Sequence, residues 1–168
     1  MFQDEARIGR IDYPKACWAP APIRPVVGAQ LVREYAYLFG AVSPKDGKHD
    51  TAIFEKANAG TMSSYLAQVE ASHPGEFILM VLDGAGWHKA RDLEVPKRMR
   101  LAFLPPYSPE LNPEEQVWDE LREKSLANRV FATLDAALDA AREGLAAMAS
   151  LPEALMRLAG RNWILDPL

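Results

Sequence analysis

The sequence has little cysteine and no long apolar run. Its single cysteine, Cys17, excludes an internal disulfide and indicates a reducing compartment. No segment is apolar over the length of a membrane span, and no charged start followed by an apolar stretch suggests a signal peptide. We therefore expect a cytoplasmic protein. With 49% hydrophobic residues among 168, the chain can bury one good core without covalent crosslinks.

The sequence also lacks an excess of positive charge: it has 19 Lys and Arg and 23 Asp and Glu, which give a net charge of −4. This argues against a dedicated nucleic-acid-binding module, which is usually basic. It still allows an enzyme that acts on nucleic acid, because clustered acidic metal ligands lower the formal charge. Segment 89–100 differs, because it is rich in bases. It is either a solvated loop or a rim that faces phosphate, and its bases are Lys89, Arg91, Lys97, Arg98 and Arg100.

Apolar patterns predict a single α/β domain over residues 1–168, without repeats or linkers. The run FILMVL at 77–82 is typical of a strand that is buried on both faces. A proline-dense segment around Trp18 should form an ordered loop. The order of elements indicates hairpin strands first and parallel crossovers later. Strands are expected over residues 2–8, 33–43, 50–55, 77–82 and 99–104.

Helices are expected at four places, each with a recognisable start. Thr61 is predicted to cap the first helix, whose apolar positions fall at helical spacing. A second helix should run from Pro113 to about Ala127. A third should follow Thr133, and a last short one should begin near Pro152.

The most informative segment is LPPYSPELNPEEQVW at 104–118. Its prolines fix φ and predict an extended turn. Asn112 and Pro113 then read as the N-cap and first residue of a helix, which places Glu115 in the first turn behind a rigid loop. Taken alone, the segment favours plain capping, because it is close to a capping box and Glu suits a helix N-terminus.

Two further acids occupy comparable places. Asp4 lies on or at the end of the first predicted strand, and Asp83 ends the apolar run 77–82. In open α/β sheets, ligands bind beyond the carboxyl ends of strands. Singly, Asp83 in the sequence DGAG suits a turn, and Asp4 beside Glu5 suits a surface charge.

The three acids together point to a different chemistry. Two carboxylates roughly 4 Å apart repel by about 4 kcal/mol at an effective dielectric near 20, so such a cluster needs shared protons or a bound cation. Oxygen ligands without Cys or His pairs favour Mg²⁺ or Mn²⁺. Two such ions can hold the attacking and leaving oxygens of a phosphodiester. The acids therefore predict phosphoryl transfer or hydrolysis.

Four blocks follow one another in an order that carries a family resemblance: FQDEAR (2–7), YPKACWAP (13–20), VLDGAGWH (81–88) and segment 104–118. In addition, 31 residues separate Asp83 from Glu115. Over about residues 2–131 the chain resembles the catalytic domain of IS630-type transposases, within the IS630/Tc1/mariner group of DDE enzymes. The resemblance implies an RNase H-like α/β fold, in which a mixed sheet of three antiparallel strands and then parallel strands is flanked by helices.

The resemblance also implies a divalent-metal-dependent nuclease and strand transferase. Asp4 would bridge two Mg²⁺ or Mn²⁺ ions, and Asp83 and Glu115 would complete the two sites. Activated water would cut the transposon ends, and the freed 3′-hydroxyl would attack target DNA. Glu114 stands where the family commonly has an apolar residue, so the role of ligand goes to Glu115.

Other residues receive weaker assignments. His88 matches a histidine usual after the second acid, where it would contact a DNA phosphate, order the site or form a plain helix-start hydrogen bond. Trp87 and Trp118 are interpreted mainly as packing residues. The candidate DNA contacts are His88, Lys89, Arg91, Lys97 and Arg98.

The chain departs from the family pattern in three ways. Pro22 stands where a glycine is usual, only three residues precede Asp4, and no helix-turn-helix region lies upstream. We therefore expect a catalytic half with a short first strand, which needs a separate or missing part to recognise inverted repeats.

A homo-oligomer is compatible with the family, although no dimer motif is visible. The alternatives are a non-catalytic remnant or interaction protein and a nuclease for RNA–DNA hybrids; the intact acids and segment 104–118 favour the transposase.

Overall fold

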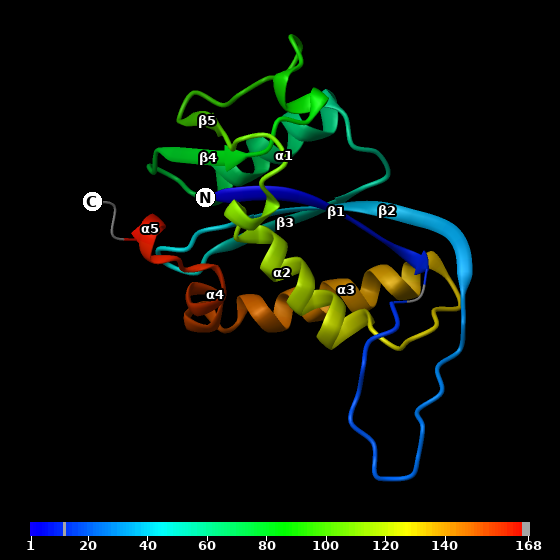
Figure 1. The fold of residues 1–168 in the computed structure, drawn as a ribbon. Coiled ribbons are helices and arrows are strands. Elements are labelled where there is room, and N and C mark those ends of the chain that lie inside the picture. Colours follow the sequence, from blue (N-terminus) through cyan, green and yellow to red (C-terminus); the bar gives the residue numbers. More distant parts are fainter. Residues whose placement is uncertain (12, 166–168) are drawn as a thin grey trace.

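The computed structural model describes residues 1–11 and 13–165, and its centre is one mixed five-stranded sheet (Figure 1). The strand order is β3-β2-β1-β4-β5. β1 pairs antiparallel with β2, and β2 with β3, whereas β1–β4 and β4–β5 are parallel. This is the mixed arrangement predicted from the sequence. The strands are β1 (Phe2–Ile11), β2 (Leu31–Val42), β3 (His49–Phe54), β4 (Ile78–Leu82) and β5 (Met99–Phe103).

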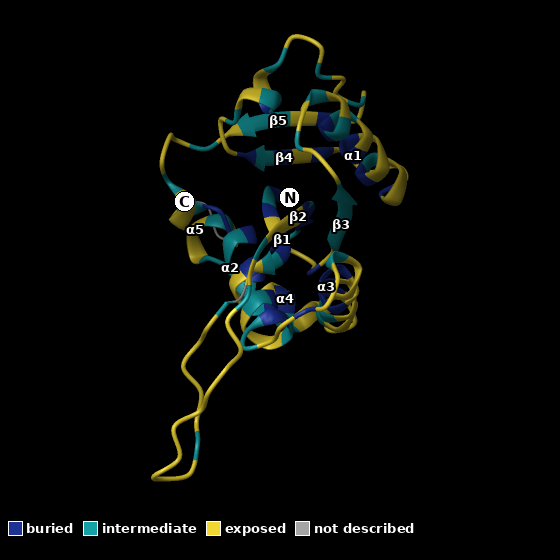
Figure 2. Cartoon of the chain, turned by 90° about the vertical axis from the view of Figure 1, so that its right-hand side faces the viewer, coloured by how far each residue is buried: buried dark blue, intermediate teal, exposed yellow. Residues whose placement is uncertain are grey.

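Helices cover both faces of this sheet (Figure 1). α1 (Ala59–Ser72) joins β3 to β4 and packs its buried side chains against β2, β4 and β5. α2 (Glu114–Leu121) and α3 (Leu134–Ala149) pack together against β1 and β2 in a second core. α4 (Pro152–Ala159) and α5 (Asn162–Leu165) follow, and Figure 2 shows the buried residues gathered between these layers. No described helix is long and apolar enough to cross a membrane.

The boundaries of α1 and α2 differ from the prediction. Asn58, rather than Thr61, caps α1: its Oδ1 accepts from the Thr61 N–H at 3.0 Å, and the Thr61 hydroxyl accepts from the Asn58 N–H at 3.1 Å. This reciprocal pair is a capping box in which Thr61 takes the third helical position. The helix predicted to reach Ala127 ends as an α-helix at Leu121 and continues as the π-helix η3 (Arg122–Leu126). The wider turn directs Leu121 and Leu126, five residues apart, into the same core.

The prediction that β4 is buried on both faces was wrong. Ile78, Met80 and Leu82 are buried against α1, but Leu79 on the opposite face is 54% exposed. Phe77 lies before the strand and is also exposed. The run FILMVL is therefore apolar throughout, although only one of its faces is fully covered.

The proline-dense segment forms a long arm that projects away from the sheet between β1 and β2 (Figure 1). Hydrogen bonds fix its base: Lys15 N–H donates to Asn128 Oδ1 at 3.0 Å, and Gln30 Nε2 donates to the Phe131 carbonyl at 2.9 Å. Trp18 lies on the arm and is fully exposed. The arm is thus attached to the domain at its two ends, and its middle makes little contact with the core.

Candidate functional site

The parallel pairing of β1 with β4 brings two of the predicted acids to the same level. Phe2 is in register with Val81, so Asp4 lies level with Asp83, which directly follows β4. β1 itself continues to Ile11 along β2. Asp4 therefore lies near the start of β1, at the point where the pairing with β4 ends, rather than at the end of the strand itself.

The loop after β5 positions the third acid. The Leu104 N–H donates to the Leu82 carbonyl at 2.9 Å, which ties the loop to β4. At its other end, Asn112 Nδ2 donates to the Gln3 carbonyl of β1 at 2.9 Å, and Asn112 Oδ1 accepts from the Glu114 N–H at 3.2 Å. Asn112 thus supports the helix start, although α2 begins at Glu114, one residue later than predicted. The following residue, Glu115, faces the same space as Asp4 and Asp83.

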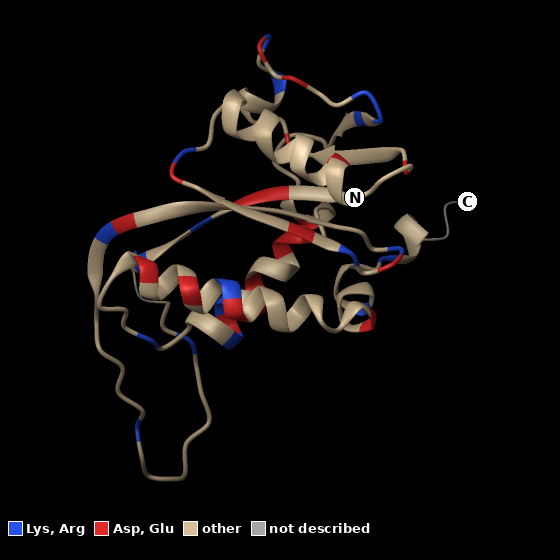
Figure 3. Ribbon diagram, turned by 180° about the vertical axis from the view of Figure 1, so that it is seen from behind, with Lys and Arg blue, Asp and Glu red and all other residues tan. Residues whose placement is uncertain are grey.

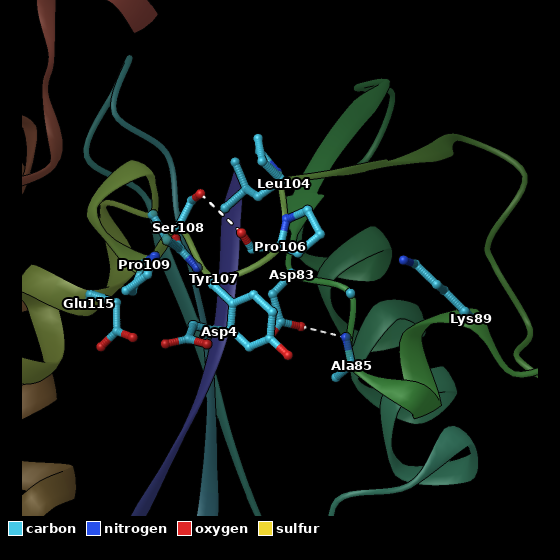
Figure 4. Close-up of a pocket in the computed structure, with 13 residues that line it drawn as sticks. Asp4, Asp83, Ala85, Lys89, Leu104, Pro106, Tyr107, Ser108, Pro109 and Glu115 are labelled. Atoms are coloured by element: carbon cyan, nitrogen blue, oxygen red, sulfur yellow. Dashed lines mark hydrogen bonds between the residues drawn. The ribbon is translucent and has the colours of Figure 1, made fainter.

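All three acids line one open pocket of ≈ 460 Å³ (Figure 4). They come from a strand, a strand end and a helix start, the three places that the sequence predicts. Among the residues that the structure describes, no group of three or more His, Cys, Asp or Glu is arranged to hold a metal ion. The acids therefore share a pocket without converging on one point. The remaining lining residues are Gly84, Ala85, Lys89, Leu104, Pro105, Pro106, Tyr107, Ser108, Pro109 and Asn112.

The environment of Asp4 opposes a negative charge. Burial, followed by the nearby carboxylates of Glu115 and Glu5, raises the pKa of Asp4 to about 8. Trp118 Nε1 donates to Asp4 Oδ2 at 3.1 Å and so orients the carboxyl group. An ionised Asp4 would need a compensating positive charge at neutral pH. The donor set is made of carboxylate oxygens, so it suits a hard divalent cation such as Mg²⁺ or Mn²⁺.

Asp83 is held by a buried histidine. His88 belongs to the short 3₁₀ helix η1 (Gly86–Lys89), and its Nδ1 lies 2.8 Å from Asp83 Oδ1. The Ala85 N–H also donates to this oxygen, at 2.9 Å. On the other side of the ring, Nε2 lies 2.9 Å from Glu5 Oε1. Burial disfavours the charged imidazole, but the hydrogen bond and charge of Glu5 and the charge of Asp83 raise the pKa of His88 above its ordinary value.

This geometry favours one of the roles that the sequence left open for His88. The side chain is 1% exposed and contacts two acids, so it orders Asp83 rather than facing solvent. Glu5 was read only as a neighbour of a surface charge, yet its side chain is 8% exposed and also accepts from Trp87 Nε1 at 3.1 Å. Trp87 therefore bonds to a carboxylate in addition to packing. No local signal identifies Glu5, because its partners lie more than 80 residues away.

Glu114 and Glu115 are neighbours in sequence but have different surroundings. The Glu114 carboxylate lies 2.8 Å from His49 Nε2, and both side chains are almost completely buried. Both pack beside Trp118, whose ring is buried, and this confirms the packing role predicted for it. The room for the Glu114 carboxylate comes from Gly40, since an added Cβ there would overlap it. Glu114 is therefore part of the core, and Glu115 alone of the two lines the pocket.

The five candidate DNA contacts do not form one patch. Lys89 lines the pocket, and its Nζ lies 4.8 Å from the centre of the Phe103 ring. Arg91 and Lys97 are exposed in the segment between η1 and β5, which Figure 3 shows as a loop that carries both basic and acidic residues and lies away from the acids of β1 and α2. Arg98 faces Glu70 of α1, with Nε 3.5 Å from Oε1. Only Lys89 of the four bases is adjacent to the acids.

Comparison with known proteins identifies the kind of domain. Residues 1–137 match the family described as DDE superfamily endonuclease. The uncharacterized protein y4pE/y4sA of Sinorhizobium fredii is 36% identical over 130 residues, which are 77% of this chain and 96% of that protein.

Solved structures of the Mos1 transposase have a similar fold. A paired-end complex with the left transposon end superposes with a TM-score of 0.61 and 16% identity, over 95% of this chain and 55% of the Mos1 chain. A Mos1 paired-end complex with Mn gives the same TM-score, identity and coverage. The chain thus spans about half the length of these proteins. Its mixed sheet and flanking helices have the RNase H-like fold of the Mos1 catalytic domain, and with the match over residues 1–137 the chain belongs to the DDE superfamily of endonucleases.

Proposed function

We propose that this domain catalyses divalent-metal-dependent DNA cleavage and strand transfer at transposon ends. The observation that carries the proposal is the arrangement of Asp4, Asp83 and Glu115 around one pocket, in which ionisation of the Asp4 carboxyl group is unfavourable without a nearby positive charge. A bound cation would make the ionised form of Asp4 favourable. Membership of the DDE endonucleases supports the same chemistry.

In this proposal Asp4 contributes to two Mg²⁺ or Mn²⁺ sites, which Asp83 and Glu115 complete. When bound, such ions activate water and stabilise the negative charge that develops on a phosphodiester. Trp118 and His88 hold the carboxyl groups of Asp4 and Asp83 in place. Lys89 supplies a positive charge at the edge of the pocket, where it would face a DNA phosphate.

DNA is the proposed partner, as it is for Mos1 in its paired-end complexes. The basic residues Arg91 and Lys97 are proposed to contact DNA outside the pocket, and the role of Arg98 as a DNA contact requires that it leave Glu70. Recognition of inverted repeats is assigned to a helix-turn-helix part. Pairing of two DNA ends would require a second copy of the chain.

The proposal is tested by nicking of supercoiled plasmid DNA. We expect Mg²⁺- or Mn²⁺-dependent nicking that EDTA abolishes. Asp83→Asn should lower it at least about 100-fold, because the neutral amide is a poor ligand and the ions supply several kcal/mol of charge stabilisation. Asp92→Asn, an exposed acid of the loop after η1, is the matched control and should retain activity.

Equal nicking by the purified protein and Asp83→Asn would show that the three acids are not the catalytic site. No nicking by either, even with a cognate DNA-binding part supplied, would favour a non-catalytic remnant that keeps the fold. Nicking that is confined to the RNA–DNA hybrid in a parallel assay would favour the hybrid nuclease.

A further inference from the structure

Tyr107 is a large aromatic residue held in water at the rim of the pocket. Its side chain is fully exposed, and its φ of 56° lies in the left-handed region that non-glycine residues rarely adopt. Among the described residues its ring makes no aromatic or cation–π pair, and its hydroxyl makes no hydrogen bond. The fold therefore maintains an unfavourable backbone conformation without gaining a contact from this side chain.

The surrounding loop fixes the backbone of Tyr107 relative to the acids. Three prolines at 105, 106 and 109 restrict φ on both sides of Tyr107. The Ser108 hydroxyl donates to the Pro106 carbonyl at 3.3 Å, which closes the turn. The loop is bonded to Leu82 and to Gln3, next to Asp83 and Asp4 respectively. The ring can turn about its own side-chain bonds, but the backbone that carries it is held at the rim of the pocket.

The pocket combines two kinds of lining. One part is charged, with the three acids and Lys89; the other consists of Tyr107 and the apolar faces of Leu104 and the prolines. In Figure 4 the Tyr107 ring extends from the loop towards Asp4 and Asp83. A ligand that fits both parts carries a phosphate next to a flat ring, and a nucleotide has this chemistry.

We infer that Tyr107 stacks on one unpaired nucleobase of the nucleotide adjoining the phosphate held at the acids. The inference rests on the proposed function, because it takes DNA to be the ligand. A base within a duplex has both of its faces covered by neighbours, so the nucleotide must be unstacked to reach the ring. Stacking accepts any base, because every base has a π-face. Tyr107 thus acts on affinity and on placement of the strand, not on sequence.

The test uses two short DNA duplexes with one unpaired nucleotide, which carries a base in one duplex and is abasic in the other. Binding to the full chain is measured by fluorescence anisotropy with Ca²⁺, which occupies oxygen sites. Tyr107→Phe keeps the ring. It is therefore the matched control. Tyr107→Asn removes the ring without adding backbone strain, because Asn tolerates the left-handed conformation.

The protein and Tyr107→Phe should prefer the base-containing duplex by about 5- to 100-fold, and Tyr107→Asn should bind both duplexes equally. An unchanged preference in Tyr107→Asn, or no binding of either duplex, would overturn the inference. A third outcome would also overturn it: the unaltered protein binds both duplexes with equal affinity, and Tyr107→Asn no longer self-associates. The ring would then belong to a contact between two copies of the chain.

Nicking separates this inference from the proposed function. If the protein nicks DNA in the presence of metal but shows no base preference, the stacking inference is wrong and the proposed catalysis stands. If the protein does not nick DNA but shows a base preference that depends on Tyr107, the proposed catalysis is wrong and the stacking inference stands.

Discussion

Asp4→Asn is expected to abolish metal-dependent nicking and, at the same time, to stabilise the metal-free protein. The first effect follows from the loss of the carboxylate proposed to bind both cations. The second follows from the cost of ionising Asp4 in its buried place beside Glu115. Asn has a similar shape and can still accept from Trp118 Nε1, so the hydrogen bond that orients position 4 can be retained.

The stabilisation should depend on pH in a defined direction. The pKa of Asp4 is 3.8 as a reference for the unfolded chain and about 8 in the folded protein. Between these values only the unfolded state releases the proton, so the free energy of unfolding falls as pH rises. Below the lower value both states are protonated and Asp4 contributes nothing. Above the upper value both are ionised and the full cost, on the order of 5 kcal/mol, applies.

Thermal unfolding in EDTA checks this prediction. The advantage of Asp4→Asn in melting temperature over the unaltered protein should grow from about pH 5 to about pH 9. Mg²⁺ should raise the melting temperature of the unaltered protein at the higher pH and leave that of Asp4→Asn unchanged, because only the folded carboxylate binds the ion. Asp92→Asn is again the control. An advantage that does not vary with pH would contradict the electrostatic account of Asp4.

Gly40→Ala is expected to lower the free energy of unfolding by about 3 kcal/mol, at the upper end of the usual cost of overpacking a core. Gly40 pairs with Asp4 in the β1–β2 ladder, and the place of its missing Cβ is filled by Glu114 Oε1 and the Trp118 ring. Both neighbours are buried, so neither can move into solvent. Displacing them would disturb the Glu114–His49 pair and the hydrogen bond from Trp118 to Asp4.

Gly86→Ala offers a matched control for Gly40→Ala, because an added Cβ at position 86 meets nothing within 4 Å. Urea unfolding followed by tryptophan fluorescence measures both variants. Equal free energies of unfolding for the two would show that the core around Trp118 adapts to the added methyl group.

The parts of the site that could be predicted from the sequence are those that local chemistry specifies. The prolines and Asn112 indicate a rigid loop before a helix, and Asp83 directly follows an apolar strand. The resemblance over the four sequence blocks then supplied Asp4. The alternation of elements indicated hairpin strands followed by parallel crossovers, but it did not give the order of the strands in the sheet. The bounds of the five strands were predicted to within two residues, except that β1 ends at Ile11 instead of residue 8.

The rest depends on pairs that are distant in the chain. Nothing around Glu5 indicates His88, and nothing around Glu114 indicates His49, 65 residues away. The exposure of Leu79 depends on which faces the helices cover, which apolar content alone does not determine. The π-helix at Arg122–Leu126 likewise reflects the packing of Leu121 and Leu126 rather than a breaker in the local sequence.

The parallel ladder between β1 and β4 consists of one registered pair, Phe2 with Val81, together with hydrogen bonds from the Val81 N–H to the Met1 carbonyl and from the Met1 amino group to the Leu79 carbonyl. Asp4 and Asp83 lie on opposite sides of this short seam. A cation bound by both carboxylates would link the two sides of this seam and so join the antiparallel and parallel halves of the sheet. Hydrogen exchange of the Val81 amide should therefore become slower when such a cation binds, which would connect occupancy of the site to the cohesion of the whole sheet.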